Sequence, residues 1–239
     1  MRMKITYSFL TILIFGSAKS EYKLTYSDTL MLKGTKSYKT LDLINAKEKL
    51  DSCIMLNPKN DECKYYRAKI EYDMQSYQTA SIMFKNVLAL NEKDASSWHM
   101  LGLCFTHLKH YDSAEFCYRN AVNLNSKRSD FFANWANNQF LRGRLDHSEE
   151  LYSTAILLDD KNPAYYTNRS EVREKMGDKV SAKDDLELAL QLDPNNQAIK
   201  GKLNSSVGIS TKIIYGIVFC ALFIFTVLWI LRRKRGGSF

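Results

Sequence analysis

The chain has 239 residues, of which 45% are hydrophobic, and this is enough for one or two domains with a sizeable core. Its formal net charge of +8 arises near the two ends, because residues 21–211 contain 26 Lys and Arg against 26 Asp and Glu. A neutral central part releases few counterions on binding a polyanion, so the charge pattern argues against nucleic acid as a partner.

The first twenty residues are typical of a secretory signal peptide. A basic start is followed by an apolar run over 5–18, and the small residues Ala18 and Ser20 lie where cleavage before Glu21 requires them. Cleavage after Ala18 is an alternative. An uncleaved signal anchor or an apolar N-terminal helix is a further one.

The middle of the chain repeats with a period of 34 residues. After a short lead over 21–26, five blocks follow without an insertion, and they are 27–60, 61–94, 95–128, 129–162 and 163–196. The eighth and twentieth positions of every block are small, which lets two crossing helices approach closely. These residues are Gly34, Ala68, Gly102, Ala136 and Ser170, then Ala46, Ala80, Ala114, Ser148 and Ala182. Each block therefore predicts a pair of antiparallel helices.

Residues typical of turns agree with the prediction of helix pairs. Pro58 and Pro194 end their blocks, because proline cannot continue a helix. Gly143 and Gly177 supply the turn between the two helices of their blocks.

The period and the small-residue pattern resemble the tetratricopeptide repeat (TPR) family over residues 27–196. The resemblance implies an all-α fold, a right-handed superhelical solenoid of five TPR helix-turn-helix repeats. The block 95–128 fits the family best. In other blocks a usual Leu at the seventh position or a usual aromatic at the eleventh is replaced, and the replacements are Lys33, Arg67, Arg169, Ser37, Glu71, Gln139 and Arg173.

The end of the array needs a cover, since a solenoid exposes the face of its last repeat. Residues 197–205 place Ile199 and Leu203 four apart, which predicts a short capping helix. Residues 206–212 read as a flexible tether.

A transmembrane helix is predicted over 213–231, where 19 consecutive residues carry no charge. That length crosses the roughly 30 Å hydrocarbon core of a bilayer. The basic tail over 232–239 is expected on the cytoplasmic side by the positive-inside rule.

Two topologies remain open. With a signal peptide, the chain is a single-pass membrane protein whose repeats are extracytoplasmic, either lumenal or periplasmic. Without one, it resembles tail-anchored proteins, whose repeats face the cytosol.

In the TPR family the first helix of each repeat lines a groove that binds an extended peptide. Carried over, this implies that aromatic and amide side chains face a ligand, and the candidates are Asn134, Asn137, Asn168, Tyr65, Tyr72, His99 and Phe140. A carboxamide both donates to and accepts from a peptide bond, so the three asparagines are the sharpest candidates. The cations with which co-chaperone TPR domains grip a C-terminal carboxylate are missing, since Ala133, Gly201 and Ser205 stand in their places.

Four cysteines lie in the repeats, namely Cys53, Cys63, Cys104 and Cys117. An oxidising compartment would permit two disulfides in any of three pairings. We expect free core thiols instead, because all four lie on or beside positions that are small and buried in this fold. Cys104, His107 and His110 are too few for a convincing metal site, so no metal is expected.

No catalytic motif is present, so the sequence predicts no enzyme, no cofactor and no small-molecule substrate. The predicted function is a membrane-anchored TPR adaptor or scaffold that binds a protein or peptide and recruits it to the membrane. The alternatives are a cytosol-facing receptor or co-chaperone in organelle docking or protein import, and a structural subunit of a membrane complex.

Overall fold

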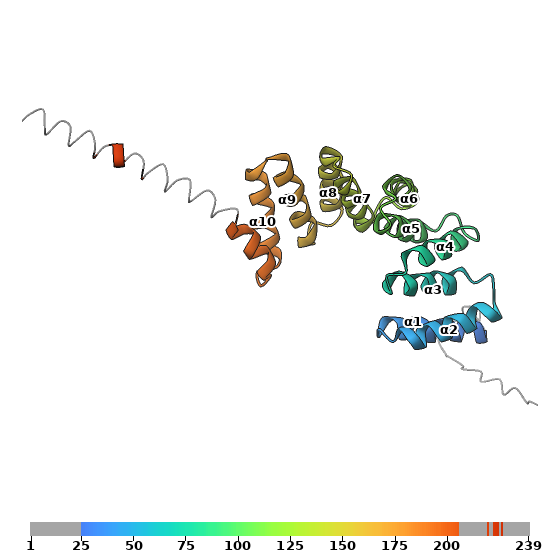
Figure 1. Ribbon diagram of the computed structural model, residues 1–239. Coiled ribbons are helices and arrows are strands. Elements are labelled where there is room, and N and C mark those ends of the chain that lie inside the picture. The colour runs from blue at the N-terminus through green and yellow to red at the C-terminus, as the bar shows by residue number, and fades with distance from the viewer. Residues whose placement is uncertain (1–24, 206–218, 220–221, 225, 227–239) are drawn as a thin grey trace, which may run out of the picture. The chain divides into compact units, whose positions relative to one another are not determined.

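The fold comes from a computed structural model, which describes residues 25–205 together with 219, 222–224 and 226. All regular structure among these residues is helical. The helices fall into two compact units, and the boundary between them lies between Glu92 and Lys93 in the sequence. Figure 1 shows them in chain order as a succession of helix pairs. The all-helical, TPR-like fold expected from the sequence is confirmed.

The first unit holds two helix pairs, each joined by a short turn and packed side by side (Figure 1). Its helices are α1 (Tyr26–Lys39), α2 (Leu43–Leu56), α3 (Asp61–Asp73) and α4 (Tyr77–Leu88). Each helix pair lies within one 34-residue block of the sequence.

The second unit holds three further pairs. Its helices are α5 (Ala95–His107), α6 (Tyr111–Leu124), α7 (Ser129–Leu141), α8 (Leu145–Leu158), α9 (Pro163–Met176) and α10 (Lys179–Leu192). Within this unit, α7 contacts both α5 and α9, so the first helices of successive blocks share one layer. That layer carries the positions from which a ligand is expected to be bound.

Small side chains allow the two helices of each block to touch. All residues at the eighth and twentieth positions are buried, as predicted. At Gly102 a Cβ atom would lie only 2.8 Å from Cε1 of Tyr118, so no larger residue fits without a shift. The bulky position that follows in the second helix fills the remaining space, and Tyr118 itself is fully buried.

The turn inside each block uses one left-handed residue at its fifteenth position. The φ angles are 61° at Leu41, 60° at Gln75, 60° at Lys109, 77° at Gly143 and 89° at Gly177. Only two of these residues are glycines, so the sequence revealed the turn in two blocks and hid it in three. The three side chains are held in a conformation that costs L-residues about 1–2 kcal/mol.

Residues 197–205 are helical and cover the last helix pair. Ile199 is buried against Leu186 and Ala189, and Leu203 packs beside it. The cluster closes the apolar end of the array, which would otherwise face water.

The signal peptide over 1–20 lies outside the described residues, as do the lead up to residue 24, the tether and the basic tail. Of the predicted span over 213–231, only residues 219, 222–224 and 226 are described. In the described part of the chain, no helix combines the length and the apolar character needed to cross a membrane.

The expectation of four free thiols is wrong for one pair. Cys53 and Cys63 form a disulfide with an S–S distance of 2.05 Å, between the end of α2 and the start of α3. The short turn between these helices brings the two Cα atoms to 6.4 Å, which is within bonding range. Cys104 and Cys117 remain reduced and buried, and burial raises the pKa of the Cys104 thiol to about 12.

Candidate peptide-binding surface

His99 and Asn134 form a pair across the boundary between α5 and α7. The imidazole Nε2 of His99 lies 2.9 Å from Nδ2 of Asn134. The same imidazole stacks on Phe131 with ring centroids 4.5 Å apart, and only 7% of His99 is exposed. His99 is therefore an interior residue that orients Asn134, whereas the sequence suggested that it faces the ligand itself.

The other two asparagines differ in their exposure and in their hydrogen bonding. Asn137 is exposed on α7. Asn168 is half-buried on α9 and forms a hydrogen bond with the Tyr152 hydroxyl. Burial and nearby Glu171 raise the pKa of Tyr152, while the bond from Asn168 acts in the opposite direction. The side-chain amide of Asn137 is thus exposed to a partner. In Asn168, one hydrogen-bonding group of the amide is already used by Tyr152, and the others can bind a partner.

Phe140 is half-buried near the end of α7, and Lys175 of α9 places its ammonium 5.3 Å from the ring centroid. This contact is a cation–π interaction, which holds the lysine over the ring face. The pair adds an aromatic and a cationic group to the layer that carries the asparagines.

The candidates in the first unit, Tyr65 and Tyr72, each lie in a group of aromatic contacts. Tyr65 meets Tyr66 and Phe84 edge-on, with ring centroids 5.4 and 5.7 Å apart. Tyr72 meets Tyr77 in the same way at 5.4 Å. The four tyrosine rings are half-buried, and each combines an apolar ring with a polar hydroxyl.

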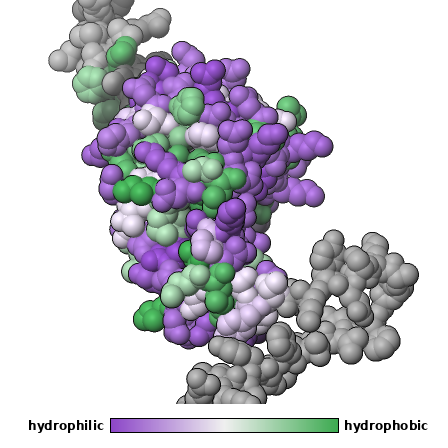
Figure 2. Space-filling view, turned by 90° about the vertical axis from the view of Figure 1, so that its right-hand side faces the viewer, coloured by the Kyte–Doolittle hydropathy of each residue, from purple (hydrophilic) through white to green (hydrophobic). Residues whose placement is uncertain are grey.

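On one face of the molecule, exposed apolar side chains are dispersed. Figure 2 shows one face of the molecule, on which hydrophobic residues form small separate patches within a largely hydrophilic surface. Interfaces for protein partners do not require a large apolar area, because aromatic and amide contacts supply affinity and specificity.

Among the described residues, no group of three or more His, Cys, Asp or Glu is placed to hold a metal ion. Cys104 is buried in α5, whereas His107 and His110 are exposed at its end.

Sequence reasoning missed two buried amides next to the candidate surface. Asn138 and Gln139 are both fully buried on α7. Asn138 donates to the Thr106 hydroxyl at 3.3 Å, but its Oδ1 has no hydrogen-bond partner, and neither amide atom of Gln139 has one. The only available signal was Gln139 at a position where the family has an aromatic residue.

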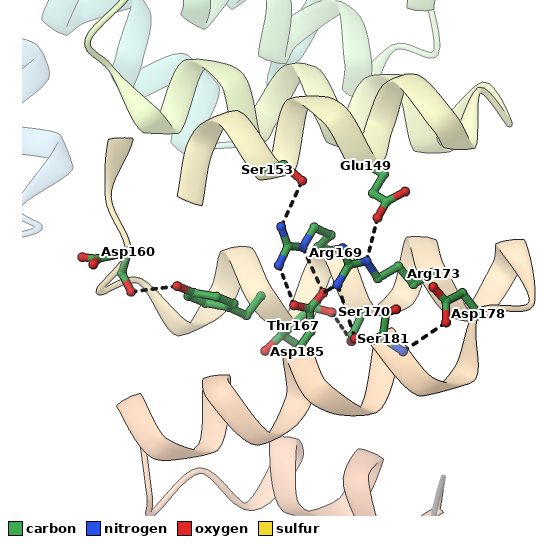
Figure 3. A network of polar contacts seen from close by, with 11 residues as sticks. Glu149, Ser153, Asp160, Thr167, Arg169, Ser170, Arg173, Asp178, Ser181 and Asp185 are labelled. Carbon is green, nitrogen blue, oxygen red and sulfur yellow. Dashed lines mark hydrogen bonds and ion pairs between the residues drawn. The ribbon is translucent and has the colours of Figure 1, made fainter. Parts of the chain in front are cut away.

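Ion pairs join the last two blocks (Figure 3). Arg169 of α9 donates to both carboxylate oxygens of Asp185 on α10 at 2.7 and 3.0 Å, and to Ser153 on α8 at 2.9 Å. Arg173, one turn further, donates to Asp185 at 3.0 Å and to Glu149 on α8 at 2.7 Å. Asp185 is 1% exposed, so this network is the polar core of the junction.

A second network joins the first two blocks. Arg67 on α3 donates to Asp51 on α2 at 2.8 Å and to Glu71 at 2.6 Å. Lys47 on α2 donates to Glu71 at 3.4 Å. Burial raises the pKa of the Glu71 carboxyl, but Arg67 and Lys47 together lower it by more, so the net pKa is below its usual value.

Comparison with known families agrees with the repeats predicted from the sequence. A family model described as a tetratricopeptide repeat matches residues 95–128 and 163–196. The chain is 26% identical over 120 residues to the BBSome complex member BBS4 of Mus musculus, and 27% identical over 145 residues to that of Bos taurus. These matches cover 50% and 60% of this chain but 23% and 28% of the relatives, so the chain spans about a quarter of their length.

Solved structures share the fold. TTC0263 of Thermus thermophilus, described as a thermophilic TPR protein, has a TM-score of 0.63 and 17% identity over 76% of this chain and 98% of its own. YrrB, described as a TPR protein with an unusual peptide-binding site, has a TM-score of 0.59 and 16% identity, over 72% and 89%. PilW, a type IV pilus biogenesis factor, has a TM-score of 0.70 and 14% identity, over 76% and 86%. The family match and these folds together support a TPR repeat protein.

Proposed function

We propose that the chain is a non-catalytic, membrane-anchored TPR adaptor, which binds an extended peptide segment of a partner protein and recruits it to the membrane. The observation that carries the proposal is the set of three asparagines on α7 and α9, one of which is oriented by His99. YrrB, which has the same fold, is described as having a peptide-binding site.

Amides suit this task because a peptide in extended conformation leaves its N–H and C=O groups unpaired. One carboxamide satisfies a donor and an acceptor of the peptide, whatever the peptide's side chains are. Phe140 and Lys175 beside them add contact area and a charge, which favours a partner with an acidic residue at that point.

We further propose that the repeats are extracytoplasmic. The signal-like segment over 1–20 and the apolar segment over 213–231 support this topology from the sequence. The disulfide between Cys53 and Cys63 supports it independently, because such bonds persist in oxidising compartments and are rare in the cytosol. A cytosol-facing, tail-anchored receptor does not account for that bond.

Peptide binding is tested by replacing Asn134, Asn137 and Asn168 together by Ala in the full-length protein and measuring the affinity for partners captured by the unmodified protein. We expect a loss of affinity of about tenfold or more, since each lost hydrogen bond contributes about 0.5–1.5 kcal/mol. The matched control replaces three exposed residues of second helices, Asn86, Asn123 and Gln191, by Ala. Equal retention of the partners by both variants would favour a structural subunit that needs no groove ligand.

Topology is tested with a glycosylation reporter. Lys127→Thr converts the exposed turn at Asn125 into the acceptor sequence Asn-Ser-Thr, at a site between α6 and α7. The unmodified chain already has acceptor sequences at Asn168 and Asn204, so translation with eukaryotic microsomes should give a glycan-dependent mass increase beyond that of the unmodified chain, which glycosidase removes. If the reporter stays unmodified and external protease digests the repeats of intact vesicles, the repeats face the cytosol.

A further inference from the structure

The two ionic networks use the same places in the repeat. Arg67 and Arg169 are the seventh residues of their blocks, and Asp51 and Ser153, to which they donate, are the twenty-fifth residues of the preceding blocks. A single geometric relation between a first helix and the second helix before it thus occurs at both junctions.

The eleventh and twenty-first positions form a second shared pair, but its polarity is reversed. Between the first two blocks, Glu71 at the eleventh position accepts from Lys47 at the twenty-first. Between the last two blocks, Arg173 at the eleventh position donates to Glu149 at the twenty-first. The cation therefore lies on the second helix at one junction and on the first helix at the other.

We propose that this reversal is a matching code, by which each of these first helices accepts its own preceding helix and rejects that of the other junction. If α3 packed on α8, Glu71 would face Glu149. If α9 packed on α2, Arg173 would face Lys47. Both wrong pairings place like charges together. The side chains of Glu71, Arg173 and Glu149 are 11%, 19% and 28% exposed, whereas that of Lys47 is 44% exposed, so the repulsion is greater between the two glutamates.

Repeat arrays need such a code because their helix pairs share one shape. An apolar residue at the eleventh position would pack against any neighbouring block, and misassembly between similar repeats is a common failure of such proteins. Buried ionic groups are weak sources of net stability, and fixing register is their best-attested role. The junction between the third and fourth blocks has no such pair, since Gln139 is neutral and Glu115 binds Arg142 instead.

The charged residue at the eleventh position, Glu71 or Arg173, also forms an ion pair within its own block. Asp185 holds both arginines of the last block, and Glu71 is held by Arg67 within its own helix. Each of these charged groups thus has a partner within its own block, which limits the entropy that is lost when the preceding helix docks.

The test uses the full-length protein in detergent micelles, with hydrogen exchange of α2 and α3 as the readout of the first junction. Lys47→Glu alone creates a like-charge pair, and we expect the protection factors of α2 and α3 to fall about tenfold further than in Lys47→Ala. The triple variant Lys47→Glu, Glu71→Arg, Met83→Asp transfers the network of the last junction, since Met83 corresponds to Asp185 in the repeat. It should regain most of the protection that Lys47→Glu loses.

The junction between the last two blocks gives an independent test, which needs no compensating substitutions. Glu149→Lys opposes Arg173 and should reduce the protection of α8 and α9 about tenfold more than Glu149→Gln, which is only neutral. The proposal is overturned if each charge reversal costs no more than its neutral counterpart. It is equally overturned if the triple variant regains no more protection than Met83→Asp combined with Lys47→Glu.

Discussion

The imidazole Nε2 of His99 lies 2.9 Å from the side-chain amide nitrogen of Asn134, and so joins the interior of α5 to the surface of α7. The bond uses one of the two amide N–H groups, so the carbonyl oxygen and the second N–H of Asn134 are the groups left for a partner. A buried side chain thus orients a half-buried amide.

The first prediction follows from that pair. His99→Phe keeps a ring against Phe131 but removes the bond to Asn134, so the amide loses its fixed orientation. Affinity for a peptide partner should fall by about 0.5–1.5 kcal/mol. The measurement is a double-mutant cycle of binding with Asn134→Ala. If the two substitutions lose affinity additively, His99 does not act through Asn134.

The second prediction concerns the left-handed turn residues. Replacing a left-handed turn residue by glycine should stabilise its unit by about 0.5–1 kcal/mol, and the three substitutions are Leu41→Gly, Gln75→Gly and Lys109→Gly. Glycine adopts the positive φ without the steric cost, and its larger loss of backbone entropy on folding offsets only part of this gain. Gly143→Ala should destabilise by a similar amount. Denaturant midpoints measure both directions, and a destabilised Lys109→Gly would contradict the strain argument.

The third prediction compares two helical glycines. Gly102→Ala should destabilise the second unit by about 1–3 kcal/mol, since its Cβ would lie 2.8 Å from Tyr118. Gly201→Ala meets nothing within 4 Å and should stabilise the capping segment by up to about 1 kcal/mol. Hydrogen exchange of α5, α6 and residues 197–205 separates the two effects. The same sign for both substitutions would refute the packing account.

The fourth prediction concerns the unpaired amide inside α7. Gln139→Met keeps the length of the side chain and removes two buried polar atoms without partners, so it should stabilise the second unit by about 1–2 kcal/mol. Gln191→Met on the exposed face of α10 is the control and should change stability by less than about 0.5 kcal/mol. Loss of stability in Gln139→Met would mean that the amide is satisfied in solution.

The sequence was a good guide wherever a side chain's size decides the packing. Gly102 and its counterparts predicted the close crossing, and Ile199 marked the segment that covers the array. It was a poor guide to the turn at Leu41 and Lys109, because nothing in their chemistry favours a positive φ. It also missed the burial of His99, since an amphipathic ring suits an interior position as well as a surface one.

Pairings were the least predictable feature. The bond between Cys53 and Cys63 depends on how closely a turn brings two helix ends together, which spacing alone does not give. The departures at Arg67 and Arg169 were visible as irregularities of the repeat. That they share a position and bind the preceding helix became clear only from the contacts.

Peptide binding by the first helices is tested most directly by site-specific photo-crosslinking in cells that express the full-length protein. A photoreactive residue at Asn137, exposed on α7, is compared with one at Glu150, exposed on the second helix α8. We predict a discrete adduct at Asn137 that Asn134→Ala weakens, and no adduct of that mass at Glu150. The same adducts at Glu150 and none at Asn137 would contradict it.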